Sequence, residues 1–365
     1  MTPMAASARI AESLPPDVAG IVAGIVRERL RPRLGAIDAG AYPDDILRAL
    51  GAAGAYGHHV DGTAAGLLAA IDAMTEAGQA CLSTAFCMWC QDALVWYLAR
   101  GDEAGPRRHL AALAAGAALG GTGLSNPMKA FSGIEPLALQ GERAGDGYRV
   151  RGRLPWVSNL GPGHRFAGIL SLPDGRRVMG LFEAGGEAVS IAANARFVAL
   201  EGTGTYTVMI RDGHLADEDV ITHDAAAFVP RIRNGFVLLQ AGMGLGLARG
   251  VAALMREDGR GRANAAFLPL GPEAIEARAD ALRARVAVSA QAHTQTDRAT
   301  FLETLRLRLD ISWLALEAAQ AAMLQFGARG YLEGAEAFRR LREAQFVAIV
   351  TPSVKHITTE LARGA

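Results

Sequence analysis

The chain has 365 residues, of which 50% are hydrophobic, and its 37 basic residues balance its 37 acidic residues. A chain of this length and composition can bury a large core, in one large domain or in two to three packed subdomains. The zero net charge argues against a nucleic-acid partner, because a protein that binds a polyanion usually presents a basic face.

The most apolar stretch, FVLLQAGMGLGLARGVAALM, is interrupted by Arg249 and is rich in glycine, so we expect no membrane span there. The first residues, MTPMAASARIAESLPPD, lack the basic start and the apolar run of a signal peptide. Both observations predict a cytoplasmic protein.

Residues 1–116 are predicted to form an all-α domain. Apolar residues recur at spacings of three and four in PPDVAGIVAGIVRERLRPRL, and Pro43 with two aspartates marks a helix start in YPDDILRALGAAGAYG. The apolar stretch from residue 62 to 101 is one long helix or a helical pair. Because no strand precedes Cys87 and Cys90, we interpret this CxxC as two buried structural thiols and not as a redox or metal motif.

Two adjacent histidines, His58 and His59, lie in the loop-like segment AYGHHVDG. Neighbouring side chains point in different directions and make a poor metal-binding pair. We therefore expect two surface or half-buried polar residues here, and no metal site in the chain.

Residues 117–224 are predicted to form an antiparallel β-barrel or sandwich, because short segments rich in Val, Ile, Phe and Tyr alternate with the turn formers PDG, AGG and RDG. Two runs of small and hydroxylated residues stand out, GGTGLSNPMKAFSG at 120–133 and LPWVSNLG at 154–161. Backbone N–H groups and hydroxyls in these runs could bind the edge of a planar heterocycle, with Trp156 as an aromatic wall. The alternative is two ordinary turns at strand starts.

Residues 225–365 contain four long helical stretches, which predict a C-terminal four-helix bundle and an α+β fold for the whole chain. The glycines of AGMGLGLARG do not have the GxGxxG spacing of a dinucleotide loop and continue a helical pattern. We expect them to allow close packing of one helix on another. No GxSxG motif of a serine hydrolase is present.

The order of the three regions and several motifs resemble the acyl-CoA dehydrogenase superfamily over nearly the whole chain. LSNP resembles the family's L-T-E-P, RLPWVSN resembles a segment ending W-I-T-N, and LQFGARGY resembles Q-x-x-G-G-x-G-Y. ILRALGAAGAYGHHV, ALEGTGTYTVMIRDGHLADEDVI and FRRLREAQFVAIV resemble further family segments. The resemblance implies a flavin-dependent oxidoreductase, in which a carboxylate takes the α-proton of an acyl thioester and the β-hydride passes to flavin N5.

The resemblance also implies a cofactor, FAD with FMN as the alternative, and a set of residues around it. Ser158 would donate a hydrogen bond to N5, which favours flavin reduction. The family's adenine-site arginine falls on Asn264, with Arg262 as a substitute, and Lys355 could meet a phosphate or lie exposed. The implied cofactor-binding residues are Thr122, Leu124, Ser125, Trp156, Val157, Ser158, Gly327, Ala328 and Ser353.

The chain departs from the family at the catalytic base. The position of the family's glutamate falls on Thr351, whose hydroxyl is not a base at neutral pH, and a second family position falls near Phe236. His356, one helical turn beyond Thr351, is a candidate near the ring or else a surface helix residue. The acidic candidates for an unusual base are Glu333, Glu360 and Asp61.

Three functions therefore stay open. The first is an acyl-CoA dehydrogenase-like enzyme with an unusual base, served by an electron-transfer flavoprotein. The second is a two-component flavin-dependent monooxygenase, which receives reduced flavin from a reductase and needs no base for an α-proton. The third is a catalytically inactive flavin-binding homologue. The resemblance implies a homotetramer or homodimer, and the apolar segment LDISWLALEAAQAAMLQF suits a helix buried in an assembly.

Overall fold

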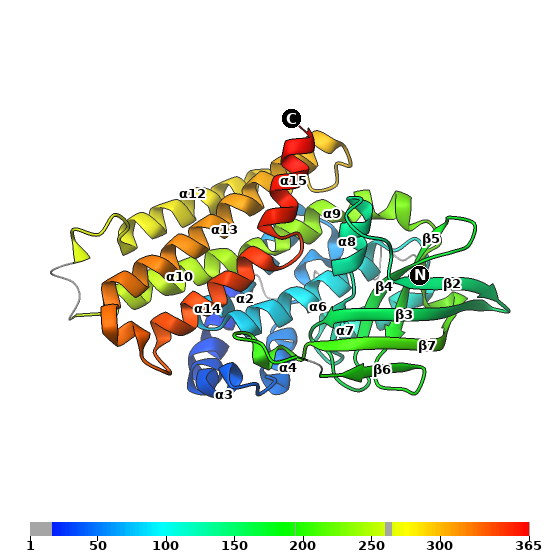
Figure 1. The fold of residues 1–365 in the computed structure, drawn as a ribbon, viewed down its shortest axis with the longest axis horizontal. Helices are drawn as coiled ribbons and strands as arrows, with labels where there is room; N and C mark the ends of the chain where they lie inside the picture. The colour runs from blue at the N-terminus through cyan, green and yellow to red at the C-terminus, as the bar shows by residue number, and fades with distance from the viewer. Residues whose placement is uncertain (1–16, 194, 260–264, 365) are drawn as a thin grey trace.

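The computed structural model describes residues 17–193, 195–259 and 265–364. Asn264 and Arg262, the residues expected near an adenine nucleotide, lie outside these described residues. Figure 1 shows the long C-terminal helices at one end of the molecule and the strands at the other, with α8 at the boundary. The expected order of helices, sheet and helices is confirmed. The domain boundaries after residues 116 and 224 stay predictions.

The regular elements in the described part of the N-terminal region are all helices. Its elements are α2 (Val18–Ile25), η1 (Val26–Leu30), η2 (Arg31–Arg33), α3 (Leu34–Asp38), α4 (Asp44–Ala52), η3 (His58–Asp61), α5 (Ala64–Ala80), α6 (Leu82–Arg100), η4 (Gly105–His109) and α7 (Leu110–Ala114). The long apolar stretch is a helical pair, because Cys81 has an extended backbone between α5 and α6. Every residue of α6 from Leu82 to Leu98 is buried, as expected for a helix that is apolar on all sides.

The three cysteines are free and buried, which confirms the interpretation of the CxxC as structural. Cys87 and Cys90 lie on α6, and burial raises the pKa of both thiols well above the usual range. Both thiols therefore stay protonated and unreactive at neutral pH.

The middle region forms a mixed sheet. Its strands are β1 (Gly120–Thr122), β2 (Leu139–Ala144), β3 (Gly147–Val157), β4 (Arg165–Ser171), β5 (Arg177–Glu183), β6 (Val189–Ala192), β7 (Tyr206–Ala216) and β8 (Val220–Thr222). The spatial order is β6-β7-β3-β2-β4-β5-β8, and β1 pairs with β4. The short elements α8 (Ser125–Phe131), η5 (Glu201–Thr203) and η6 (Asp217–Asp219) connect the strands.

The sheet departs from the expected antiparallel arrangement in two ladders. β1 and β2 both pair with β4 in parallel, whereas the other ladders are antiparallel. The turn formers between segments predicted hairpins, and hairpins do join β2 to β3 and β4 to β5. The parallel pairs arise because β4 lies between the β2–β3 hairpin and β5, an order that local turn signals do not encode.

The C-terminal region comprises α9 (Ala225–Leu239), α10 (Ala241–Glu257), α12 (Pro272–Gln291), α13 (Arg298–Phe326), η7 (Gly327–Tyr331), α14 (Glu336–Ile349) and α15 (Val354–Gly364). Helices α10, α12, α13 and α14 pack on one another as a bundle. One hydrophobic core joins these helices to the N-terminal ones, and a second core lies within the sheet.

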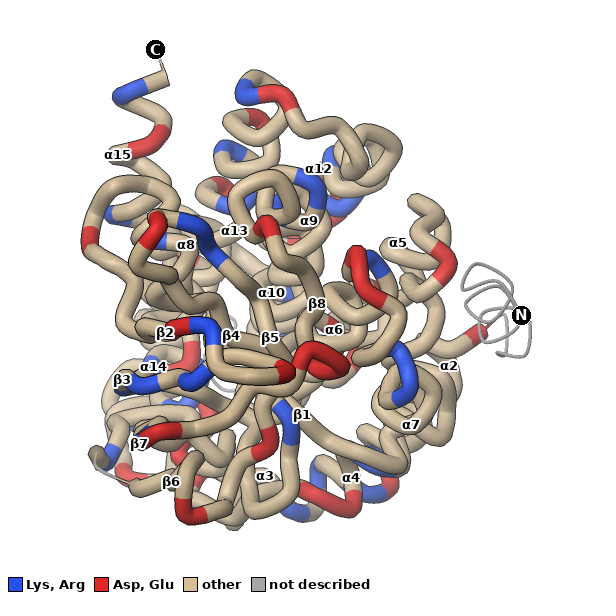
Figure 2. Tube along the Cα trace, turned by 90° about the vertical axis from the view of Figure 1, so that its right-hand side faces the viewer, with Lys and Arg blue, Asp and Glu red and all other residues tan. Residues whose placement is uncertain are grey.

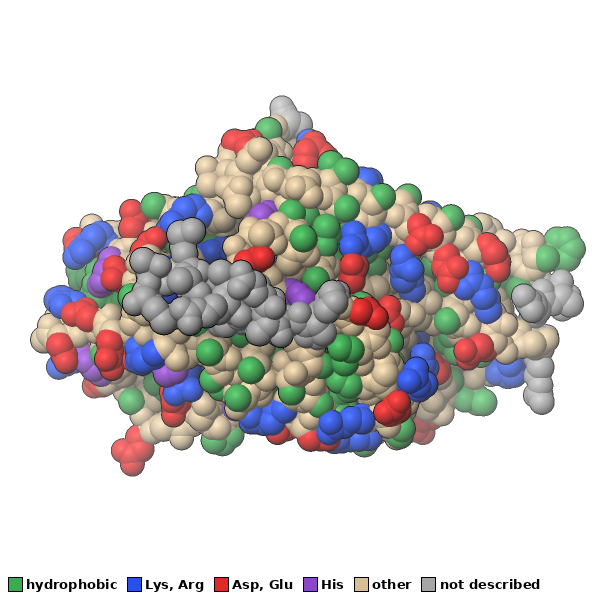
Figure 3. All heavy atoms as spheres, turned by 180° about the vertical axis from the view of Figure 1, so that it is seen from behind, with side chains coloured by type: hydrophobic (Ala, Val, Ile, Leu, Met, Phe, Trp, Pro, Cys, Tyr) green, Lys and Arg blue, Asp and Glu red, His purple; other side chains and the backbone are tan. Residues whose placement is uncertain are grey.

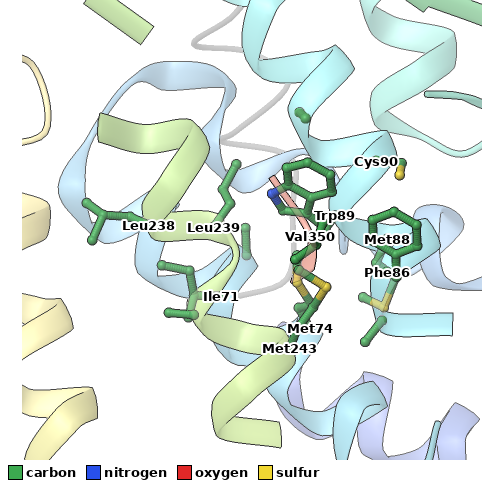
Figure 4. Close-up of a cluster of buried hydrophobic side chains, with 14 of the residues drawn as sticks. Ile71, Met74, Phe86, Met88, Trp89, Cys90, Leu238, Leu239, Met243 and Val350 are labelled. Atoms are coloured by element: carbon green, nitrogen blue, oxygen red, sulfur yellow. The ribbon is translucent and has the colours of Figure 1, made fainter. Parts of the chain in front are cut away.

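Glycines allow α10 to approach α5 closely, which confirms the expectation for AGMGLGLARG. A Cβ added at Gly246 would lie 2.5 Å from the Thr75 carbonyl oxygen, and one at Gly250 would lie 2.2 Å from that of Gln79. In Figure 4, Met74 of α5 and Met243 of α10 meet at this contact, beside Trp89 of α6.

Helix α14 is also tied to the end of α5 by two buried arginines. Arg339 and Arg340 both pair with Glu343, and their guanidinium groups donate to the carbonyls of Gly78, Gln79 and Ala80. The cations thus satisfy carbonyls that the last turn of a helix leaves without partners.

One helical run in the described chain, Ala225–Glu257, is long and apolar enough to cross a membrane. Because 83% of its most apolar window is buried inside the structure, packing within the protein accounts for that composition. Charged residues of both signs are interspersed over the views of Figures 2 and 3, in keeping with the balanced composition.

Candidate active site

The two runs of small and hydroxylated residues meet in space. β1 pairs with β4, and the side-chain amide of Asn159 donates to the Gly120 carbonyl over 2.6 Å. A Cβ added at Gly121 would lie 2.0 Å from the Ser158 carbonyl oxygen, and one at Gly123 would lie 2.7 Å from that of Ala167. These glycines are therefore required by the close approach of the protein's own backbone.

Asn159 holds the corner after β3 in one conformation. Its backbone has a φ of 61°, which asparagine tolerates better than most residues. The side chain is fully buried, accepts a hydrogen bond of 2.6 Å from the Tyr42 hydroxyl, and lies 3.3 Å from the Gln91 side-chain oxygen. Gln91 also accepts from the Gly120 N–H. The corner is thus fixed to β1 and to the N-terminal helices.

A cavity of about 410 Å³ opens beside this corner. Its walls combine aromatic faces with hydroxyl groups. The aromatic lining residues are Phe86, Trp89, Trp156, Phe197, Phe236 and Phe346. The hydroxylated lining residues are Thr122, Ser125, Ser158, Thr203, Thr205 and Thr351. Trp156 is 51% exposed and packs edge-on against Phe197, so one indole face stays available to a ligand.

Five of the residues implied by the family resemblance line this cavity, namely Thr122, Ser125, Trp156, Ser158 and Thr351. The sequence analysis missed Thr203, Thr205, Phe197 and Lys129. The signal for the two threonines was present in EGTGT, which is a third run of small and hydroxylated residues.

Two implied residues point away from the cavity into the cores. Leu124 belongs to the helical core and Val157 to the core of the sheet. They support the lining residues beside them rather than forming the wall.

Gly327 and Ala328 lie in η7, at the end of α14 opposite Thr351. A helix of 14 residues is about 20 Å long, so these residues do not reach the cavity of the same chain. Ser353 accepts a hydrogen bond from the His356 backbone N–H and so caps the start of α15. Contacts of these three residues with a cofactor stay predictions.

Thr351 is held at the cavity by an unexpected buried network. Its hydroxyl lies 2.9 Å from that of Ser125, and its carbonyl accepts a hydrogen bond of 2.8 Å from the side-chain amide of Gln240. Arg308 in turn donates to the Gln240 side-chain oxygen over 2.7 Å and to the Val347 carbonyl. Burial lowers the pKa of Arg308 to about 10, so this arginine remains a cation at neutral pH.

His356 is buried and lies outside the cavity lining. Its Nε2 is 2.8 Å from the Ser132 hydroxyl, and burial lowers the pKa of the imidazole. His356 is thus not a surface residue, which corrects that interpretation, and it does not belong to the cavity lining. Its place near a bound ring stays a prediction.

No carboxylate belongs to the lining found within the described residues. Asp61 accepts from the backbone and side chain of Thr63, Glu360 is buried beside Arg298, and Glu333 is exposed just beyond η7. The charged group among the described lining residues is Lys129, which lies 3.2 Å from Glu135.

The expectation that His59 is a surface or half-buried residue is wrong. His59 is fully buried, and its Nε2 lies 3.0 Å from Asp92 Oδ1 on α6. Burial lowers the pKa of His59 to about 3 and raises that of Asp92 well above its usual range. The pair is therefore neutral, with the Asp92 carboxyl group donating to the imidazole.

The helix–sheet–helix architecture matches the acyl-CoA dehydrogenase fold. Residues 18–117 match the family described as acyl-CoA dehydrogenase, N-terminal domain. No curated protein matches the chain.

Among solved structures, the chain resembles an electron transferring flavoprotein of Acidaminococcus fermentans, with a TM-score of 0.83, 17% identity, and coverage of 95% of this chain and 96% of the other. It resembles butyryl-CoA dehydrogenase from Megasphaera elsdenii, with a TM-score of 0.81, 16% identity, and coverage of 95% and 98%. It also resembles PigA, solved with FAD and proline, with a TM-score of 0.79, 15% identity, and coverage of 98% and 97%.

Proposed function

We propose that the protein is a flavin-dependent oxidoreductase, with the flavin ring in the cavity between Trp156 and the Ser125–Thr351 contact. The observation that carries this proposal is the lining, which combines a half-exposed indole with a set of hydroxyl groups. An isoalloxazine ring has apolar faces and a polar edge, so it needs both kinds of wall. PigA, which has a similar fold, was solved with FAD.

The described residues fit such a ring. Aromatic side chains exclude water from its faces, while the hydroxyls of Thr122, Ser125 and Thr205 can meet its carbonyl and N–H groups. The Lys129 ammonium is the cationic group of the described lining, and Glu135 holds it in place over 3.2 Å. FAD is the cofactor that we propose, and FMN is the alternative.

The lining favours an oxygen-dependent reaction over α,β-oxidation of an acyl thioester. Removing an α-proton needs a positioned base, and the described lining offers hydroxyls and a paired lysine but no carboxylate. A bound reduced flavin would supply the two electrons with which one atom of dioxygen is reduced to water while the other enters the substrate. In this reaction the protein orients the substrate and excludes solvent, and a flavin reductase supplies the reduced cofactor.

The decisive experiment compares the two reactions on one preparation. The protein is loaded with FAD, and the flavin absorbance is followed while butyryl-CoA and longer acyl-CoAs are added without oxygen. We expect the absorbance to persist. The protein with reduced FAD is then mixed with oxygen, and we expect a transient absorbing species before reoxidation. Rapid bleaching by any acyl-CoA would instead establish dehydrogenation, with an electron-transfer flavoprotein as the acceptor.

We further propose a homotetramer or homodimer in the cytoplasm. Exposed apolar side chains on the bundle support self-association, since Trp313, Leu324 and Tyr331 are uncovered in the single chain. The mass in solution, measured by light scattering, tests the assembly.

A further inference from the structure

Three hydroxyl groups form a continuous chain along one wall of the cavity. The Ser158 hydroxyl lies 2.6 Å from that of Thr205, which lies 2.8 Å from that of Thr203. The Thr203 hydroxyl lies 2.7 Å from the Leu200 carbonyl oxygen. Ser158 comes from the corner after β3, while Thr203 ends η5 and Thr205 precedes β7.

The carbonyl at the end of the chain fixes the direction of every hydrogen bond. A carbonyl can only accept, so the single hydrogen of the Thr203 hydroxyl is donated to Leu200. Thr203 must then accept from Thr205, and the hydrogen of Thr205 is used. Thr205 must in turn accept from Ser158. The hydrogen of Ser158 is thus committed to the protein.

This direction reverses the role that the family resemblance implied for Ser158. The resemblance implied a hydroxyl that donates to flavin N5. In the structure, the Ser158 oxygen can offer a ligand only its lone pairs, because its hydrogen points to Thr205. A ligand group that meets Ser158 in the cavity must therefore be a donor.

We propose that this one-way hydroxyl chain makes the cavity select reduced flavin over oxidised flavin. The inference rests on the proposed function. Oxidised flavin has an unprotonated N5, which can only accept, whereas reduction adds a hydrogen there and turns the same edge into a donor. An acceptor facing an acceptor leaves both groups without a partner in a largely buried site, and that is costly. A site of this kind suits a protein that receives reduced flavin from a separate reductase.

The test measures the dissociation constants of oxidised FAD and of dithionite-reduced FAD, both without oxygen, and takes their ratio. We expect wild-type protein to bind reduced FAD roughly tenfold or more tightly, which corresponds to one hydrogen bond gained. Thr203→Val keeps the side-chain shape but cannot accept. Thr205 then turns to donate to Ser158, and the Ser158 hydrogen becomes free to face the cavity. We expect the preference for reduced FAD to fall roughly tenfold.

Two further variants make the result decisive. Thr207→Val is the matched control, because Thr207 is a buried threonine on β7 whose hydroxyl donates to the Pro155 carbonyl outside the chain. It should keep the wild-type ratio. Ser158→Ala removes the acceptor directly and should also lower the ratio, which covers the case in which Thr203→Val does not fold.

The outcomes separate the inference from the proposed function. Equal loss of affinity for both oxidation states in Thr203→Val and Ser158→Ala would show a structural role alone and overturn the inference. Wild-type protein that binds oxidised FAD at least as tightly as reduced FAD would also overturn it, while leaving a flavoprotein. Binding of neither FAD nor FMN in either state would overturn the proposed function itself.

Discussion

The hydroxyls of Ser125 and Thr351 lie 2.9 Å apart although 226 residues separate them in the chain. This contact joins the first residue of α8 to the segment between α14 and α15, and both residues line the cavity. Thr351, which the family resemblance implies at the position of the base, therefore lies at the cavity and contributes a hydroxyl to its lining.

Installing a carboxylate at this position should create dehydrogenase activity. Thr351→Glu places a general base in the cavity, and such a base contributes roughly a hundredfold or more to proton removal. Thr351→Gln is the control, because it has the same size without a basic oxygen. We expect Thr351→Glu to be bleached by butyryl-CoA at least about a hundredfold faster than Thr351→Gln. Equal rates would show that the absent carboxylate is not what limits thioester oxidation.

Trp156→Ala should weaken flavin binding with little effect on folding. The indole is half exposed without a ligand, so little burial is lost on removing it, whereas a bound ring loses an aromatic wall. We expect the dissociation constant for FAD to rise roughly tenfold, measured by flavin fluorescence. Trp313→Ala removes a comparably exposed indole from α13 and should leave the constant unchanged. An equal effect of both substitutions would place the ring elsewhere.

Asn159→Ala should destabilise the fold by about 2–4 kcal/mol. The substitution leaves the Gly120 carbonyl without the hydrogen bond that the Asn159 amide donates. It also places alanine at a φ of 61°, where the Cβ atom is unfavourable and no side-chain hydrogen bond offsets the cost. Asn159→Gly relieves only the backbone cost and should lose about 1–2 kcal/mol less. Urea unfolding gives both values. The role assigned to the amide is wrong if both variants unfold within about 0.5 kcal/mol of the wild-type protein.

His59 should make the free energy of unfolding fall as the pH drops below about 6.5. The unfolded chain then binds a proton that folded His59, with its pKa lowered to about 3, does not. The free energy of unfolding therefore decreases at low pH, because the unfolded state, which binds more protons, is favoured there. His59→Gln keeps an acceptor for Asp92 but cannot titrate. Between pH 7 and pH 5, the free energy of unfolding of this variant should therefore decrease by about 2 kcal/mol less than that of the wild-type protein.

Denaturant unfolding at pH 5, 6 and 7 measures this difference. Asp92 is present in both proteins, so its own contribution largely cancels. Parallel pH profiles for His59→Gln and the wild-type protein would show that the imidazole is accessible to protons in the folded state.

Periodicity alone predicted much of the fold. The helical spacing of the N- and C-terminal regions and the short β-rich segments between them gave the order of the three regions, because each element has to bury one face. The glycines of α10 were correctly read as helix-packing residues, since their spacing continued a helix. Residues from both runs, at 120–133 and 154–161, line one cavity, and the binding of a ring there stays a prediction.

The sequence by itself determined which segments are helices or strands and which small and hydroxylated residues could surround a ligand, because these depend on neighbours along the chain. Only the tertiary structure decided that β1 and β2 run parallel to β4, that His59 is buried against Asp92, and that Ser158 faces the cavity as an acceptor. Each of these depends on a partner brought from elsewhere. For Ser158 that partner is the Thr205 hydroxyl. The direction of this hydrogen bond depends on the Leu200 carbonyl, which can only accept from Thr203 at the far end of the hydroxyl chain.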